Sequence, residues 1–185
     1  MMNVRRFLLA AMLLFAAGAA SAQTIDAARS SVSATFKQMG VPVEGKFKKV
    51  GGQVGYDPAN PVAAQAKIDV DVASFDLGDA QYNHEVQQKD WFDAARFPAA
   101  SFVSTSVKAA AAGRLEVAGK LTIKGRSVNV NVPLSVRNDA GATVFEGSVP
   151  IRRLAFAIGE GEWKDTALLA DEVTLKFRLV VGTAK

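Results

Sequence analysis

The sequence has no cysteine and only one histidine in 185 residues. Without thiols, the chain cannot use thiol catalysis, thiolate metal sites or covalent haem attachment. Disulfide bonds are excluded as well, so a hydrophobic core must hold the fold, and one domain of this length can supply it. The single histidine, His84, lacks the second imidazole or thiol that a transition-metal site needs. We expect His84 to be a solvent-facing helix residue and expect no metal site.

Catalytic and nucleotide-binding motifs are also missing. No G-x-S-x-G elbow occurs that could place a nucleophilic serine near His84 and an acid. Asp69 and Asp71 could pass for a carboxylate pair, but they fall on the polar phase of a predicted strand. The segment 159–161, Gly-Glu-Gly, is too acidic to bind phosphate. We therefore expect a protein without catalytic residues, enzymatic activity or a cofactor.

The net charge is also small, and long apolar runs are few. The net charge is +4 at pH 7 and falls to +2 without Arg5 and Arg6. No run of Lys and Arg contains interleaved aromatic residues, so nucleic acid is not an expected partner. The apolar run 7–17 is too short and too rich in alanine for a good membrane span.

The first residues instead have the pattern of a signal peptide. Arg5-Arg6 forms a positive n-region, 7–17 is the apolar core, and Ala20-Ser21-Ala22 is a small-residue cleavage site. We predict that residues 1–22 are removed after Ala22 and that the protein is periplasmic, with no transmembrane segment after cleavage. An uncleaved N-terminal anchor is the alternative.

What the sequence has in abundance is alternation of apolar and polar residues. Strict period two gives a strand one apolar and one polar face. Two short runs flanking Gly51-Gly52 read as one long strand with a bulge or as two short strands. The alternating segments are 31–36, 41–56, 66–72, 101–108, 114–124, 127–137, 143–151 and 172–181.

These segments predict an all-β fold. No strand is regularly followed by a helix, which argues against a parallel α/β sheet. We expect residues 23–185 to form an eight-stranded antiparallel lipocalin-like barrel, with a β-sandwich as the alternative. Two long connections interrupt the strands, 79–98 and 152–171, and the first contains one short helix that ends before Phe97-Pro98.

The hairpin 114–137 is the clearest local signal. Gly125 at the first central position of a type II′ turn would make Ile123 face Val128. Apolar residues then meet along the whole ladder. Pro133 would fall at a hydrogen-bonded position without an N–H to donate, so we expect a bulge or bend there.

Alternation alone does not say which face is inside. An outer-membrane barrel has the same period, but here aromatics are few, glycine and alanine stand where a lipid-facing band needs bulk, and the chain ends in a polar tail. We expect the apolar face to point inward. Gly45, Gly119 and Gly147 share that inward phase, where they leave room for a ligand or mark bends in the wall.

Several motifs resemble the YceI-like family of polyisoprenoid-binding proteins. Residues 90–93 (DWFD), followed by 96–98 (RFP) and Ser101-Phe102, are similar to its DFFD…YP…F signature. Residues 119–125 (GKLTIKG) resemble its G-x-L-T-I-x-G hairpin, and 153–159 (RLAFAIG) its R-x-D-F-G-I segment. The match covers the chain from Gln23 onward with its spacing intact.

The chain also departs from the family pattern. Glu85 stands at the family's histidine position, and Ala155 and Ala157 stand where aspartate and glycine are common. These departures concern polar head-group contacts and leave the barrel and its apolar interior untouched.

The resemblance implies an exported barrel that binds, sequesters or transports a long isoprenoid lipid, of quinone or polyprenyl type, without catalysis. A homodimer is left open. Such a ligand needs only an apolar sheath, because each CH₂ removed from water gains about 0.8 kcal/mol. The alternative is a periplasmic protein-interaction or stress module with a packed barrel. Residues 159–163 resemble those of a subgroup whose relatives are sometimes fused to membrane cytochromes of the b561 type, and such a module could be accessory to a cytochrome of this type.

We assign contact with the isoprenoid tail to large or inward residues. The aromatic members in the two long connections either plug one end of the barrel or line its mouth. The assigned residues are Phe36, Phe47, Trp91, Phe92, Phe97, Phe102, Gly119, Leu121, Ile123, Phe156 and Trp163.

Overall fold

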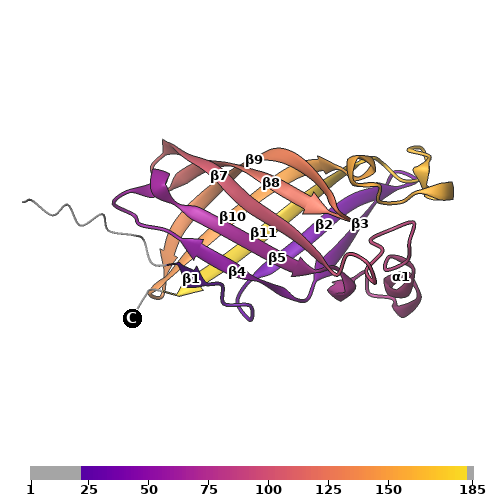
Figure 1. Ribbon diagram of the computed structural model, residues 1–185, viewed down its shortest axis with the longest axis horizontal. Helices are drawn as coiled ribbons and strands as arrows, with labels where there is room; N and C mark the ends of the chain where they lie inside the picture. The colour runs from indigo at the N-terminus through magenta and orange to yellow at the C-terminus, as the bar shows by residue number, and fades with distance from the viewer. Residues whose placement is uncertain (1–21, 183–185) are drawn as a thin grey trace, which may run out of the picture.

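The computed structural model describes residues 22–182 and shows one antiparallel sheet that curls into a barrel (Figure 1). The predicted signal peptide lies outside the described residues except for Ala22. The strand order is β1-β4-β5-β7-β8-β9-β10-β11-β2-β3-β6. The strands are β1 (Gln23–Thr24), β2 (Ser31–Gln38), β3 (Val41–Phe47), β4 (Val50–Gly55), β5 (Gln65–Asp71), β6 (Phe75–Asp76), β7 (Ala99–Ala111), β8 (Arg114–Ile123), β9 (Arg126–Asp139), β10 (Ala142–Arg152) and β11 (Glu172–Gly182).

The expected all-β barrel is confirmed in general, but its sheet has eleven strands and not eight. The expected strand 41–56 is two strands, because the chain changes partners at Lys48-Lys49: β3 pairs with β2 and β6, and β4 with β1 and β5. The remaining extra strands, β1 and β6, have two residues each, too few for a period to show. Gly52 has φ +135° and lets β4 approach β5, since a Cβ there would overlap the carbonyl oxygen of Lys67.

The hairpin of β8 and β9 is present, but its turn and register were predicted wrongly. Lys124 and Gly125 both have positive φ, 49° and 72°, so the turn is of type I′. Ile123 consequently pairs with Arg126 instead of Val128. The shift of two residues along the partner strand leaves every side chain on its expected face, because the side-chain period is two.

Pro133 interrupts a different ladder from the one predicted. It pairs with Glu116 without a register shift between β8 and β9. In the observed register its nitrogen faces β10. The ladder between β9 and β10 accordingly ends at the pair of Leu134 and Gly147, next to a residue that has no N–H to donate. Among the described residues, β9 and β10 do not pair beyond Leu134 and Gly147.

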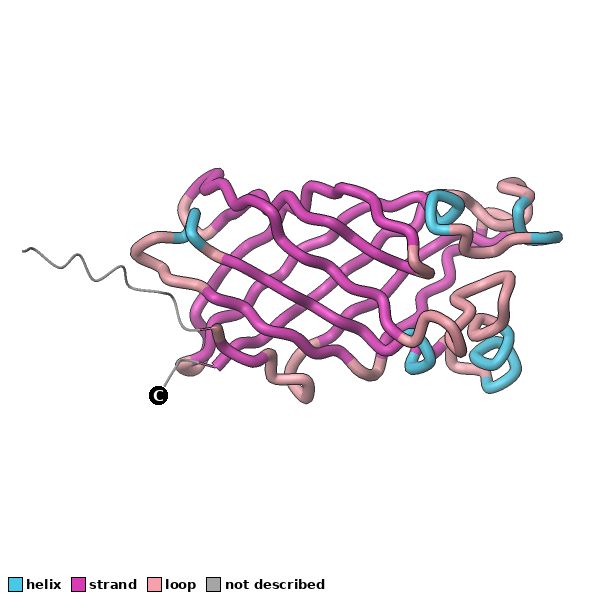
Figure 2. Tube along the Cα trace, viewed as in Figure 1, coloured by secondary structure: helices cyan, strands magenta, loops and turns pink. Residues whose placement is uncertain are grey.

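The helical segments gather mainly at one end of the barrel. In Figure 2, α1 (Ala80–Glu85), η2 (Val72–Ser74), η3 (Arg153–Phe156) and η4 (Gly161–Lys164) lie at the right-hand end, and η1 (Pro61–Ala63) lies at the opposite end. Asp79 caps α1 by accepting hydrogen bonds from the N–H groups of Gln81 and Tyr82. No helix within residues 22–182 is long and apolar enough to cross a membrane.

The apolar phase of the strands points inward. The largest core cluster fills the end that carries α1 and both long connections, and Val72 and Phe156 there are each only 1% exposed. A second cluster around Ile25, Phe145 and Val181 packs the other end. Between the two clusters the barrel is not filled.

Candidate functional site

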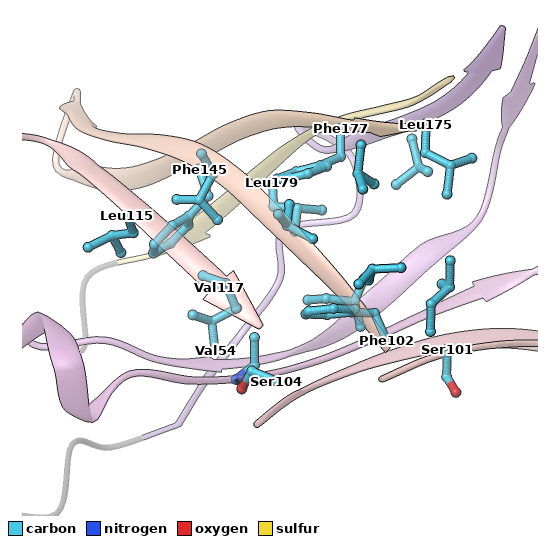
Figure 3. Close-up of a pocket in the computed structure, with 18 of the residues that line it drawn as sticks. Val54, Ser101, Phe102, Ser104, Leu115, Val117, Phe145, Leu175, Phe177 and Leu179 are labelled. Carbon is cyan, nitrogen blue, oxygen red and sulfur yellow. Dashed lines mark hydrogen bonds between the residues drawn. The ribbon is translucent and has the colours of Figure 1, made fainter. Parts of the chain in front are cut away.

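An apolar cavity of about 150 Å³ lies inside the barrel. In Figure 3, Leu115, Val117, Phe145 and Leu179 converge on it from three strands, and the hydroxyl of Ser101 points away. This volume is smaller than that of most small-molecule sites, which measure roughly 300–1,000 Å³. Its lining is Val32, Val54, Ala64, Gln65, Ala66, Ile68, Val70, Ala100, Ser101, Phe102, Ser104, Val107, Leu115, Val117, Leu121, Val130, Val132, Leu134, Phe145, Val149, Leu175, Phe177 and Leu179.

The period of two explains this lining. Leu115, Val117 and Leu121 are alternate residues of β8, and Val130 and Val132 are alternate residues of β9. Their polar neighbours point outward. This lining contains no charged side chain, and its polar members are Gln65, Ser101 and Ser104. It can remove hydrocarbon from water.

The inward glycines make room for aromatic rings of the protein. A Cβ added to any of them would overlap a phenylalanine ring on an adjacent strand, so the ring takes the room for a ligand that was one of the two expected roles of these glycines. This arrangement, with a ring covering a strand glycine, stabilises strongly curved sheets. The pairs are Gly45–Phe75, Gly119–Phe102 and Gly147–Phe177.

Two of the residues assigned to the isoprenoid tail, Phe102 and Leu121, line the cavity, and Gly119 lies beneath the Phe102 ring. The others do not line it. Phe97 packs against the turn glycine Gly125. Those in or against the core cluster of the plugged end are Phe36, Phe47, Trp91, Phe92, Ile123 and Phe156.

The aromatic residues of the two connections form the plug that was one of their expected roles. The Trp91 and Trp163 rings lie 5.5 Å apart between centroids and join the two connections. Phe92 meets Phe47 and Phe75 edge to face, at 6.1 and 5.6 Å. The indole Nε1 of Trp91 is buried without a hydrogen-bond partner among the described residues. Contact between these rings and a ligand stays a prediction.

Arg153 is buried within the second connection, 152–171, and binds its backbone. It is 3% exposed, and its guanidinium donates to five backbone carbonyl oxygens at 2.6–3.0 Å. Burial lowers the pKa of Arg153, and the charge of Asp171 opposes this shift. The acceptors are the carbonyls of Ile158, Gly159, Trp163, Leu169 and Ala170.

Lys124 ties this connection to the hairpin. Its Nζ lies 2.7 Å from the carbonyl oxygen of Ala157 and 3.3 Å from the Glu160 carboxylate, and its side chain is only 9% exposed. The turn of β8 and β9 is therefore held against the plug.

The polar residues considered in the sequence lie away from the cavity. The Nε2 of His84 lies 3.3 Å from the side-chain nitrogen of Gln88 at the surface. Asp71 accepts from the N–H of Ala73 and forms an ion pair with Lys49 at 3.2 Å. Residues 22–182 contain no cluster of three or more His, Cys, Asp or Glu side chains that could hold a metal ion.

Sequence reasoning missed most of the lining. Leu115, Phe145 and Leu179 carry the same inward-phase signal as Leu121. We favoured large aromatics instead, and most of those lie in the connections. The signal that identifies the lining is the inward phase of the strands.

The chain resembles known proteins along nearly its whole described length. Residues 23–181 match the model of the YceI-like domain. A UPF0312 protein of Shewanella sp. (strain MR-7) is 34% identical over 147 residues, 78% of this chain and 71% of the relative. A UPF0312 protein of Vibrio cholerae is 36% identical over 116 residues, and the match spans 61% of each protein.

Solved structures show the same fold. The crystal structure of Burkholderia cenocepacia BcnA has a TM-score of 0.82 and 51% identity, covering 84% of this chain and 98% of that chain. A polyisoprenoid binding domain from Saccharophagus degradans has a TM-score of 0.69 and 17% identity, covering 90% of this chain and 99% of that domain. With a family match that covers most of the residues and relatives above 30% identity, the chain belongs to the YceI-like family.

Proposed function

We propose that the barrel binds one long-chain isoprenoid lipid, of quinone or polyprenyl type, and carries or sequesters it without changing it chemically. The observation that carries this proposal is the cavity, which is lined almost entirely by Val, Leu, Ile, Phe and Ala. Such a lining stabilises hydrocarbon in proportion to the area removed from water. The likeness to a polyisoprenoid binding domain supports the choice of ligand.

The site of action in this proposal is the periplasm. Arg5-Arg6, the apolar run 7–17 and Ala20-Ser21-Ala22 support export. The family match begins at Gln23, directly after the predicted cleavage site, which supports the same boundary. N-terminal sequencing of the protein from its native envelope is expected to begin at Gln23, and a retained Met1 in the mature protein would contradict export with cleavage.

The test of binding is a calorimetric titration with quinones that share a head group and carry one, four or eight isoprene units. Affinity should rise by about 1 kcal/mol or more per added unit until the cavity is full, because each unit buries further hydrocarbon. Mass spectrometry of an organic extract should show the same class of lipid in the purified protein. Equal affinity for all three quinones, or no binding, contradicts the proposal and favours a packed interaction module.

A matched pair of variants locates the binding site. Val117→Phe adds a ring to the cavity lining and should weaken the longest quinone at least tenfold by occupying its space. Val103→Phe makes the same change on β7, where the side chain is 44% exposed, and should leave affinity unchanged. Equal losses in both variants would place the lipid elsewhere.

A further inference from the structure

A second hollow lies on the outside of the barrel where β9 and β10 separate. It has a volume of about 620 Å³ and lies over the place where the β9–β10 ladder ends, next to Pro133 and Gly147. Leu115, Leu134 and Phe177 line both this hollow and the internal cavity. At this place these three residues therefore lie between the cavity and the outer hollow.

The absence of a ladder makes this place different from the wall between β8 and β9. Pairing between β9 and β10 stops at Leu134 and Gly147, whereas β8 and β9 pair without interruption from Arg114–Ser135 to Ile123–Arg126. Gly147 contributes no side chain, and the Phe177 ring fills the space beside it. Displacing apolar side chains here breaks no backbone hydrogen bond between the two strands.

Both ends of the barrel are less suitable as openings. One end holds the plug, in which Phe156 is 1% exposed, and the other is packed around Ile25 and Val181, 5% and 2% exposed. β5 and β7 also part, but there the N–H of Ala66 donates to the Ser104 hydroxyl at 2.8 Å and bridges them. The gap between β9 and β10 has no such bridge among the hydrogen bonds of residues 22–182.

The outer hollow is charged, in contrast to the cavity. Arg178 lies 3.1 Å from the Glu146 carboxylate, so these two charges offset each other. Arg114 and Lys176 have no ion pair or side-chain hydrogen bond within the described part of the chain, and neither has the carboxylate of Glu116. The free charges of the hollow are thus two positive and one negative, which favours an anion.

We propose that this hollow binds the head group of the lipid and that the preferred head group is a phosphate ester. The inference rests on the proposed function, since the tail then lies in the cavity and passes between Pro133 and Ser148, where β9 and β10 no longer pair. Arg114 and Lys176 face the phosphate, and the hydroxyl of Ser148 can donate to it. Glu116 opposes it. An amphiphile fits the pair of spaces because one is apolar, the other is charged, and they share a wall.

The experiment compares a polyprenol with the polyprenyl phosphate of the same chain length. The wild-type protein should bind the phosphate roughly tenfold more tightly, a difference typical of charge-assisted contacts. The double variant R114Q/K176Q should lose this preference and keep its affinity for the polyprenol. Glu116→Gln should increase the preference. The matched control K120Q/R126Q changes two exposed cations outside the hollow and should behave as wild type.

The outcomes separate the two proposals. Binding of neither lipid overturns the proposed function, whereas equal binding of both lipids overturns only the head-group site. A preference that survives in R114Q/K176Q would likewise overturn the site. Inorganic phosphate is the third arm: it should compete only at concentrations far above those of the lipid, and competition at the lipid's own concentration would indicate a site for free phosphate instead.

Discussion

Arg153 is a buried cation whose hydrogen-bond partners are backbone carbonyls. Removing its five donated hydrogen bonds leaves the five accepting carbonyls of the second connection without these donors. Arg153→Met should therefore lower the free energy of unfolding by about 3 kcal/mol. The free energy of unfolding of Arg153→Lys should lie between those of the wild type and of Arg153→Met. An ammonium group has fewer N–H donors than a guanidinium and lacks its planar arrangement of donors.

The neighbouring arginine provides the control. Arg152 is exposed and pairs with Asp171 at 3.2 Å, so Arg152→Met should change stability by about half a kcal/mol or less. Urea unfolding curves measure all three variants. Equal effects at Arg152 and Arg153 would show that the carbonyl network does not hold the connection.

Leu121 and Lys120 test which face of the sheet is inside. Leu121 is 9% exposed and lines the cavity, so Leu121→Lys places a charge in an apolar space and should cost several kcal/mol. Lys120 is exposed, and Lys120→Glu should stay within about half a kcal/mol. Denaturant curves with equal losses would reverse the assignment of the faces.

Asp76 gives the fold an acid-sensitive contact. Hydrogen bonds from Lys48 and Asn83 and from the N–H of Gly78 hold its pKa at about 2, below the ordinary 3.8. A carboxyl with a lowered folded-state pKa adds stability above its unfolded pKa and loses it as the pH falls through the folded value. Asp76→Asn should flatten the decline in stability between about pH 4 and 2, measured by thermal unfolding across that range; an unchanged slope would contradict this role.

At the scale of elements, the strand phases were predictable and the pairings were not. Alternation fixes the face of Leu121 and Val128, but it is unchanged by a shift of two residues. The turn decides between those registers, and Lys124 at φ 49° was not recognisable as a turn residue from its type. The very short strands β1 and β6 had no period to detect.

For the candidate site, too, one part was predictable from the sequence and another was not. Its apolar character was predictable from the inward phase. The positions of the aromatic residues were not, because the connections 79–98 and 152–171 take their shape from distant contacts, such as those of Arg153 and Lys124. A ring in a connection carries no period that says whether it plugs the barrel or lines the cavity.

The gap between β9 and β10 predicts that a cross-link there slows lipid uptake. Pro133 and Ser148 would form the next pair if that ladder continued. Replacing both by cysteine and joining them with a short bismaleimide should slow lipid uptake at least tenfold in stopped-flow fluorescence, because side chains can no longer part there. The chain has no native cysteine, so labelling is specific.

The control cross-link joins residues that are already paired. Asn138 and Thr143 face each other in the same ladder, away from the gap. Joining them should leave uptake unchanged. Equal rates for both cross-linked proteins would mean that the lipid enters by another route, such as the place where β5 and β7 part.

For the whole molecule, the arrangement is a barrel packed at both ends and empty between them. The plug and the hairpin are held together by Lys124, and β1 lies against both β4 and β11. The bound lipid would then fill the space between the two packed ends of the core. Lipid binding should raise the thermal midpoint, and the rise should grow with free lipid concentration by mass action.

The empty middle also gives the protein an excess molar volume. An apolar void stays dry, and unfolding floods it, so unfolding of the lipid-free barrel is accompanied by a larger decrease in volume than unfolding of a filled one. Mass action moves the midpoint of a pressure titration, whereas the slope of the unfolding free energy against pressure reports the volume itself. That slope should be steeper for the empty barrel, so hydrostatic pressure would distinguish loaded from unloaded protein without any label on the lipid.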